Sequence, residues 1–272
     1  MLGVSFVFAA AVGVVLYRKK ILHPKAFGTT EAKQRDVWGV PAPVWFVCAA
    51  MVFLGHQVCM GLAMALPPSV RGEAPAMKAV AVPQLMGYAG ALGLALLLVW
   101  LIRPRTTVKT GLSVGWSDVW VGGLALILAA PFYVLASSLS QTVHRLISGT
   151  PPPEVAHATL ELILAHKNDP WAWGVVIAAV VMAPVVEELT HRAFLQSSFL
   201  GVIGKTWPAI FVTSVLFVLV HTSVTPPEAW PGLFVLSVAL GIAFERTRRI
   251  GVPMVMHVLF NAVNVVIAVV SA

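Results

Sequence analysis

Residues 171–200, WAWGVVIAAVVMAPVVEELTHRAFLQSSFL, join a long apolar run to a charged group. The first sixteen residues carry no charge, residues 187–192 hold two glutamates, a histidine and an arginine, and the sequence is apolar again from Ala193. An apolar helix of about 20 residues crosses a bilayer core of roughly 30 Å. This stretch therefore predicts a membrane-spanning helix that carries ionisable side chains inside it.

The composition of the whole chain also indicates a membrane protein. Of its 272 residues, 58% are hydrophobic and 11% are charged, and the mean hydropathy is +0.88. Soluble domains carry about 25% charged residues, so an ordinary soluble protein is excluded. The net charge of +7 does not indicate a nucleic-acid partner, because the basic residues are spread over short loops and form no basic domain.

Eight apolar segments are separated by short charged stretches, so we expect an all-α, polytopic membrane protein with about eight transmembrane helices. The expected segments are residues 1–17, 42–66, 79–102, 118–139, 171–200, 206–224, 230–245 and 250–271. Residues 1–140 would hold the first four helices, which contain no recognisable motif. Residues 141–170 would form an extracytoplasmic loop, and residues 171–272 would hold the remaining four helices.

The 141–170 loop contains one further expected element. After a turn at Pro151–Pro153, residues 154–167 place apolar side chains at helical spacing and predict a short helix. Two placements stay open: a helix lying on the outer membrane surface, or an ordinary loop helix packed against the bundle.

Basic residues are divided unequally between the two sides of the expected bundle. Thirteen lie in the first, third, fifth and seventh loops, and four lie in the loops on the other side. The positive-inside rule places the richer loops in the cytoplasm and both termini outside. Because the basic residues follow the first apolar run instead of preceding it, we expect a retained anchor and not a cleaved signal peptide.

Charged side chains inside a membrane helix need a partner or a purpose, because each costs about 2.5–3.5 kcal/mol to insert. Glu188 and Arg192 are four residues apart and are expected to form an ion pair, as are Glu187 and His191. Pro184 lacks a backbone N–H and should kink the helix beside the carboxylates. The alternative is that the polar group marks the end of the helix at the cytoplasmic surface.

If this helix continues to a turn at residues 201–204, the next helix returns and places His221 at the depth of Glu187. His257 and Asn261, four residues apart in the last segment, share one helix face. A lone intramembrane histidine or asparagine more often holds helices together. As a group, the carboxylate and one imidazole can deprotonate water, and the second imidazole and the amide can stabilise an oxyanion.

Three motifs follow one another on the last helices. They are Glu187-Glu188-x-x-x-Arg192, Phe217-x-x-x-His221 and His257-x-x-x-Asn261. In this order they resemble the motifs of the CPBP family, also called Abi, which includes type II CAAX prenyl endopeptidases and lysostaphin-resistance and bacteriocin-processing proteins. The resemblance covers about residues 170–270.

The resemblance implies an intramembrane glutamic endopeptidase, a hydrolase that cleaves a membrane-associated peptide or protein within the lipid bilayer. It implies that Glu187 and His221 activate the attacking water, and that His257 and Asn261 stabilise the oxyanion, without a cofactor or metal. The supporting residues that it implies are Glu188, Arg192 and Phe217. The turn at residues 201–204 and the basic loops beside it favour substrate entry from the cytoplasmic side.

The chain departs from the family pattern at His191, where an apolar or aromatic residue is usual. Either this is a surface substitution without effect, or the imidazole modulates the charge of Glu187. The histidine also keeps open a metal-dependent protease, in which the Glu187, His191, His221 and His257 side chains hold zinc. Two other classes remain as alternatives: a non-catalytic membrane scaffold and a proton-coupled transporter.

Overall fold

The computed structural model describes residues 2–23, 26–27, 35–37, 39–74, 76–107, 110–151 and 157–271, and every regular element within these ranges is helical. The α-helices are α1 (Leu2–Arg18), α2 (Ala42–Met64), α3 (Pro68–Arg71), α4 (Lys78–Ile102), α5 (Ser117–Ser148), α6 (Ala158–Ala165), α7 (Trp171–Ile177), α8 (Ala183–Glu188), α9 (Ser197–Ile203), α10 (Thr206–His221), α11 (Trp230–Thr247) and α12 (Gly251–Ser271). Two π-helical segments, η4 (Ala178–Met182) and η5 (Leu189–Gln196), and two 3-10 turns, η2 (Arg103–Arg105) and η6 (Pro227–Ala229), complete the order.

Six helices of the described chain are long and apolar enough to cross a membrane. They are Ala42–Met64, Lys78–Arg105, Ser117–Ser148, Trp171–Ile203, Pro227–Thr247 and Gly251–Ser271. Two shorter apolar helices, Gly3–Arg18 and Thr206–His221, lie at the other two expected positions. The all-α, polytopic membrane fold is therefore confirmed, whereas the number of about eight spans stays a prediction.

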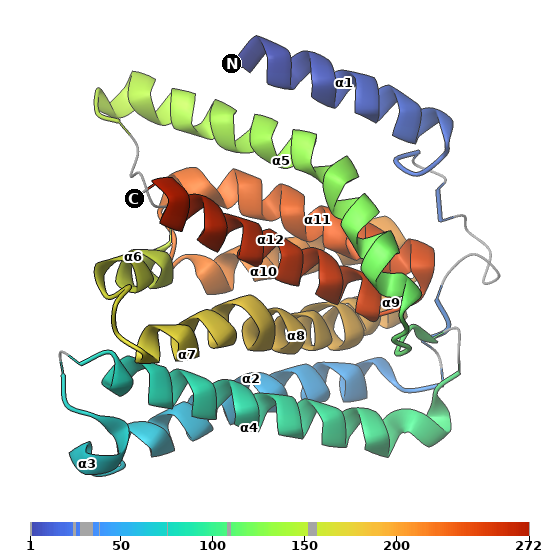
Figure 1. Cartoon of the computed structure of the whole chain (residues 1–272). Helices are drawn as coiled ribbons and strands as arrows, with labels where there is room; N and C mark the ends of the chain where they lie inside the picture. Colours follow the sequence, from blue (N-terminus) through green and yellow to red (C-terminus); the bar gives the residue numbers. More distant parts are fainter. Residues whose placement is uncertain are drawn as a thin grey trace.

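The helices form layers around the helix from Trp171 to Ile203 (Figure 1). The α2–α4 pair packs on one side of it, and α10, α11 and α12 lie on the other side. α5 covers α11 and α12, and α1 packs on α5. The motif-bearing helix is thus at the centre of the bundle, where side chains on several of its faces meet protein instead of lipid.

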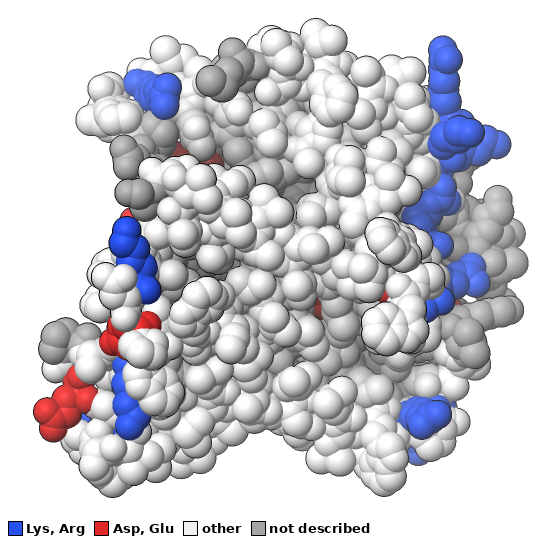
Figure 2. All heavy atoms as spheres, in the orientation of Figure 1, with Lys and Arg blue, Asp and Glu red and all other residues white. Residues whose placement is uncertain are grey.

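Charged side chains gather at the two ends of the helices, and a broad band of uncharged side chains lies between them (Figure 2). One end of the bundle holds the C-terminus of α1, the α9–α10 turn and the α11–α12 turn. We call it the basic end. Its parts contact one another, since Arg246 donates to the carbonyl oxygen of Lys20 at 3.1 Å and Ser198 donates to that of Ala42 at 2.8 Å. Lys25, Lys33 and Lys109, which also belong to the predicted basic loops, lie outside the described residues.

The helix from Trp171 does not end at the charged group, so the alternative of a helix end there is wrong. It continues through Glu187 and Arg192 to Ile203, and Gly204 ends it in the left-handed conformation with φ of 68°. A π-helical segment lies directly before Pro184, whereas the kink expected at this proline stays a prediction. Two π-helical segments flank the glutamates. Such π-helical bulges often lie at functional sites.

The predicted connection after residue 139 is partly wrong, because α5 continues to Ser148. Residues 140–148 contain no glycine or proline, and the helix ends at Gly149, whose φ of 68° is left-handed. The expected loop helix is present as α6, whereas residues 152–156 lie outside the described residues. Ile163 of α6 is buried against Met77, Ala81 and Val175, which supports the packed loop helix of the two placements.

Candidate active site

A cavity of about 770 Å³ lies between the α2–α4 pair, the Trp171–Ile203 helix, α10 and α12, with α6 at one end. The predicted residues Glu187, Phe217, His221, His257 and Asn261 all line it. The predicted supporting pair is absent from the lining and lies behind it. The structure therefore brings the three motifs together around one cavity, as the equal spacing from the helical turn predicts.

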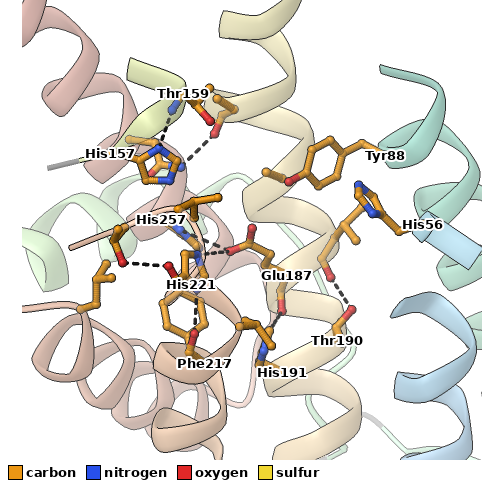
Figure 3. Close-up of a pocket in the computed structure, with 18 of the residues that line it drawn as sticks. His56, Tyr88, His157, Thr159, Glu187, Thr190, His191, Phe217, His221 and His257 are labelled. Carbon is orange, nitrogen blue, oxygen red and sulfur yellow. Dashed lines mark hydrogen bonds and ion pairs between the residues drawn. The ribbon is translucent and has the colours of Figure 1, made fainter. Parts of the chain in front are cut away.

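Two histidines face the same oxygen atom of Glu187 (Figure 3). The Nε2 atom of His221 lies 3.6 Å from Oε2 of Glu187, and the Nε2 atom of His257 lies 3.9 Å from it. Both distances exceed the range of a direct hydrogen bond. The Glu187 side chain is 21% exposed, whereas that of His257 is 4% exposed, so the carboxylate is the member that opens to the cavity.

The hydrogen bonds of the two rings assign their protons. Nδ1 of His221 lies 2.7 Å from the carbonyl oxygen of Phe217, and Nδ1 of His257 lies 2.8 Å from Oε1 of Glu188. Both oxygens are acceptors, so each Nδ1 carries the hydrogen, and Nε2 of a neutral ring is left as an acceptor. Three acceptors then face one small space, and a molecule with two hydrogens, such as water, fits that arrangement.

Glu188 and Arg192 form the predicted ion pair in a fully buried position. Nη1 of Arg192 donates to Oε1 of Glu188 at 3.0 Å, and neither side chain is exposed. Nη2 of Arg192 donates to the hydroxyl of Ser237 at 2.8 Å and to its carbonyl oxygen at 3.1 Å. Because Oε1 of Glu188 also accepts from His257, this pair fixes the orientation of the ring that faces Glu187.

The predicted ion pair between Glu187 and His191 is wrong. Nδ1 of His191 lies 2.9 Å from the backbone carbonyl oxygen of Glu187, and the carboxylate points away into the cavity. His191 is also not a surface residue, because it is 5% exposed and meets the ring of Phe217 edge-on at 5.2 Å. The neighbouring pair with the same spacing, Glu188 and Arg192, does form, so the difference lies in the direction of the Glu187 carboxylate.

Phe217 lies at the centre of the predicted residues, in agreement with a packing role. Its ring is fully buried and lies 4.4 Å from the ring of His221 and 5.8 Å from that of His257, between centroids. The guanidinium carbon of Arg192 lies over the ring at 4.8 Å. One aromatic side chain therefore separates the buried ion pair from the cavity and holds both histidines in place.

Asn261 is anchored by the π-helical segment that precedes Pro184. In this segment the N–H of Ala183 bonds to the carbonyl oxygen of Ala178, five residues earlier. Pro184 has no N–H for the next carbonyl in that register, Ala179, and Nδ2 of Asn261 donates to it instead at 2.8 Å. No other described residue bonds to this amide, so its second hydrogen and its oxygen face the cavity wall.

Three cavity residues were missed in the sequence: His56 on α2, Tyr88 on α4 and His157 before α6. Nδ1 of His157 accepts from the N–H of Thr159 at 3.2 Å, which leaves its Nε2 to carry the hydrogen. Burial lowers the pKa of His157, the nearby His221 lowers it further, and Glu187 opposes both effects. No motif marks these residues, although His56 and Tyr88 are polar side chains within apolar runs.

Substrate entry beside residues 201–204 is not supported by the lining of the cavity. The loop residues that line it, among them His157, Ser223 and Thr225, lie at the end of the bundle that holds α6, opposite the basic end. Within the described residues, no group of three or more histidine, cysteine, aspartate or glutamate side chains has an arrangement that could hold a metal ion.

Residues 169–263 match the family model described as type II CAAX prenyl endopeptidase Rce1-like. The match covers all three motifs and confirms the resemblance seen in the sequence. No curated protein and no solved structure matches the chain.

Proposed function

We propose that this protein is an intramembrane endopeptidase that hydrolyses a membrane-associated peptide or protein, because residues 169–263 match the family model described as type II CAAX prenyl endopeptidase Rce1-like. The observation that carries the proposal is the approach of His221 and His257 to one oxygen of Glu187 at the cavity wall. The structure of the site supports a water molecule held between these acceptors. A scaffold would gain nothing from such a group of polar side chains exposed to a cavity.

In the proposed first step, Glu187 accepts a proton from the bound water while His221 orients it. The water oxygen forms a bond to the peptide carbonyl carbon, and the carbonyl oxygen becomes an oxyanion. In the second step the carbon–nitrogen bond breaks, and the proton held by Glu187 passes to the leaving amine. No proton is gained or lost over the two steps, so Glu187 ends as it began.

The oxyanion would be stabilised from α12. His257 would donate to the oxyanion as an imidazolium that takes a proton from solvent onto Nε2 before the reaction and keeps it through both steps, while its Nδ1–H stays bonded to Glu188. The free hydrogen of the Asn261 amide provides a second donor, since the other is fixed on Ala179. Donors that are held in place before the reaction need no reorganisation when the negative charge develops.

N-terminal profiling of membrane peptides tests this function. Membranes from cells that carry wild-type protein or Glu187→Gln would be compared, with Glu73→Gln as a control because Glu73 is an exposed acid outside the cavity. We expect new N-termini that depend on Glu187 and not on Glu73. Identical profiles with wild-type protein and Glu187→Gln would contradict proteolysis and favour a scaffold or transporter.

A second arm of this experiment separates metal-free from metal-dependent hydrolysis. Purified protein would be treated with a chelator, its metal content measured, and cleavage repeated with and without added zinc. Full activity of metal-free protein is the expected result. Loss of cleavage that zinc restores would assign the chemistry to a metal bound by the glutamate and histidine side chains.

We also propose that the protein is a multi-pass protein of the cell membrane with its basic end in the cytoplasm. On this orientation His157 and Ser223 lie on the outer side, so the substrate would enter from that side or from the lipid. Single cysteines introduced at Lys205 and Ser223 would be labelled in intact cells with an impermeant reagent. We expect labelling at residue 223 only, and the reverse pattern would invert the orientation.

A further inference from the structure

The cavity has a second wall that lies outside residues 169–263. It is formed by α2 and α4. These helices pack closely at Gly90, where the side chain of Cys59 fills the space that a Cβ atom would need. The lining side chains of this wall include Phe46, Phe53, His56, Gln57, Gln84 and Tyr88. Of the ten described residues of α2 and α4 that line the cavity, four are polar, although both helices are apolar enough to span a membrane. Packing alone does not require polar side chains here.

The position of Tyr88 is fixed by its contact with His56. The two rings lie 4.5 Å apart between centroids and are tilted by 58°. Gly87 allows this contact, because a Cβ atom at that position would lie 3.1 Å from Nε2 of His56. His56 therefore fills the space between α2 and α4 and supports one face of the tyrosine ring.

The hydroxyl of Tyr88 points into the cavity from the side opposite His221 and toward Glu187 (Figure 3). Among the residues that the structure describes, none forms a hydrogen bond with this hydroxyl. A tyrosine hydroxyl within apolar surroundings usually has a partner, because leaving it unbonded costs free energy. The hydroxyl is therefore available to a molecule bound between α4 and Glu187.

The cavity lining indicates the chemical class of that molecule. The described lining residues include neutral hydrogen-bonding side chains, such as Gln57, Gln84 and Asn264, but no lysine or arginine. An anionic group held mainly by charge would need such a cation. Neutral donors and acceptors between apolar side chains match the amide groups of a peptide backbone.

We propose that Tyr88 is a substrate-positioning residue, whose hydroxyl donates to a backbone carbonyl of the peptide and holds the scissile bond against Glu187. This inference rests on the proposed endopeptidase function and extends it to the N-terminal helices. His56 supports Tyr88 from behind. The wall formed by α2 and α4 thus positions the peptide, while residues from α8, α10 and α12 carry out hydrolysis.

Tyr88→Phe is the sharpest test, because it removes the hydroxyl and keeps the ring that packs on His56. Tyr17→Phe is the matched control, since Tyr17 lies on α1, outside the cavity. A fluorescent farnesylated CAAX-type peptide would serve as the probe for binding and for cleavage by purified protein. We expect Tyr88→Phe to raise Kd and KM about tenfold, with kcat changed by less than about threefold and the melting temperature unchanged. Tyr17→Phe should change none of these.

The outcomes separate this inference from the proposed function. Kd and KM that are the same in wild-type protein and Tyr88→Phe would overturn the role of Tyr88 alone. Binding that depends on Tyr88, without cleavage by wild-type protein, would support the peptide site and overturn the endopeptidase function. Wild-type protein that does not bind the peptide would overturn both for this class of substrate.

Discussion

Two buried arginine–glutamate clusters have nearly the same composition, but only one of them borders the cavity. In each cluster an arginine donates to a glutamate and to a serine hydroxyl and lies over a phenylalanine ring. The cavity cluster consists of Glu188, Arg192, Ser237, Phe217 and His257. The closed cluster consists of Arg35, Glu245, Ser197, Gln196 and Phe244.

The polar contacts of the closed cluster that the structure describes are all with protein groups away from the cavity. Arg35 donates from Nε to Oε1 of Glu245 at 3.0 Å and from Nη1 to Ser197 at 2.9 Å, and Gln196 donates to the same Oε1 at 2.7 Å. Arg35 is 1% exposed and Glu245 is 4% exposed. The cluster ties residues 35–37 to η5, α9 and α11 at the basic end, so its role is to hold the bundle together.

The cavity cluster differs in the side chain that donates to its glutamate, because Nδ1 of His257 bonds to Glu188 where Gln196 bonds to Glu245 in the closed cluster. Through this bond the buried pair acts on a ring whose other nitrogen faces Glu187. Buried charge in a membrane helix is therefore not by itself a mark of an active site. The mark is a buried charge that orients a side chain exposed to a cavity.

The largest expected effect is a loss of cleavage activity at the cavity with little loss of stability. His221→Ala should lower the cleavage rate about a thousandfold, within the range for a lost acid–base partner. The free energy of unfolding should fall by only about 1 kcal/mol, because the ring lies at the cavity wall and its loss removes one hydrogen bond, to the carbonyl oxygen of Phe217. Cleavage assays and thermal unfolding in detergent measure the two quantities.

The control for this variant is His166→Ala, since His166 also contacts the carbonyl oxygen four residues earlier but does not line the cavity. Its cleavage rate should equal that of wild-type protein. An equal loss in both variants would assign the effect to the helix ends instead of the site.

At the closed cluster we expect the opposite result, a loss of stability with little change in cleavage activity. Arg35→Met should lower the free energy of unfolding by about 3–5 kcal/mol, because it leaves Glu245 buried without its cation. The rate per folded molecule should stay within about twofold of wild type. Adding Glu245→Leu should restore most of the stability, because no unpaired charge is then left.

Arg105→Met provides the control, since Arg105 is exposed and its loss should cost at most about 0.5 kcal/mol. If Arg35→Met lowered the rate of the folded fraction strongly, the two clusters would be coupled, and the distinction between them would fail.

At Ser237 we expect a smaller effect, in which both cleavage activity and stability decrease. Ser237→Ala removes the hydroxyl that accepts from Arg192, which should cost about 1.5 kcal/mol and slow cleavage about threefold to tenfold as His257 loses its fixed orientation. Ser198→Ala, which removes a hydrogen bond to the carbonyl oxygen of Ala42, should affect stability alone. Unchanged cleavage in Ser237→Ala would show that Arg192 does not position the site.

The smallest effect concerns the pH dependence of His157. Its pKa is lowered from 6.5 in the folded protein, so the unfolded chain binds more protons and stability falls as the pH drops below about 6.5. In His157→Gln the melting temperature should therefore depend less on pH between about pH 5 and 7. Parallel curves for the variant and wild-type protein would contradict the buried, neutral state of this imidazole.

Much of the fold followed from apolar runs, because length and hydropathy are local properties of the sequence. The helix at residues 171–203 and its return through α10 also placed Glu187 and His221 correctly, since helical rise sets depth. The orientation of His191 could not be predicted, because its ring bonds to a backbone carbonyl oxygen and packs on Phe217 of another helix. The closed cluster was also hidden, since Arg35 and Glu245 are 210 residues apart.

The second wall of the cavity could have been suspected from the sequence. Polar side chains in an apolar run drew attention to Glu187, and the same criterion applies to His56, Gln84 and Tyr88. What the sequence does not contain is their direction, because nothing in it tells which faces of α2 and α4 meet the central helix. The structure supplies that direction through the close packing at Gly87 and Gly90.

The most direct test of the central claim is the cleavage rate of purified Glu187→Gln relative to wild-type protein, with both shown by thermal unfolding to be equally folded. Glutamine keeps the size of the side chain but cannot accept the proton from water. The account predicts a loss of about a thousandfold in kcat with an unchanged melting temperature. Cleavage by Glu187→Gln at the wild-type rate would contradict it.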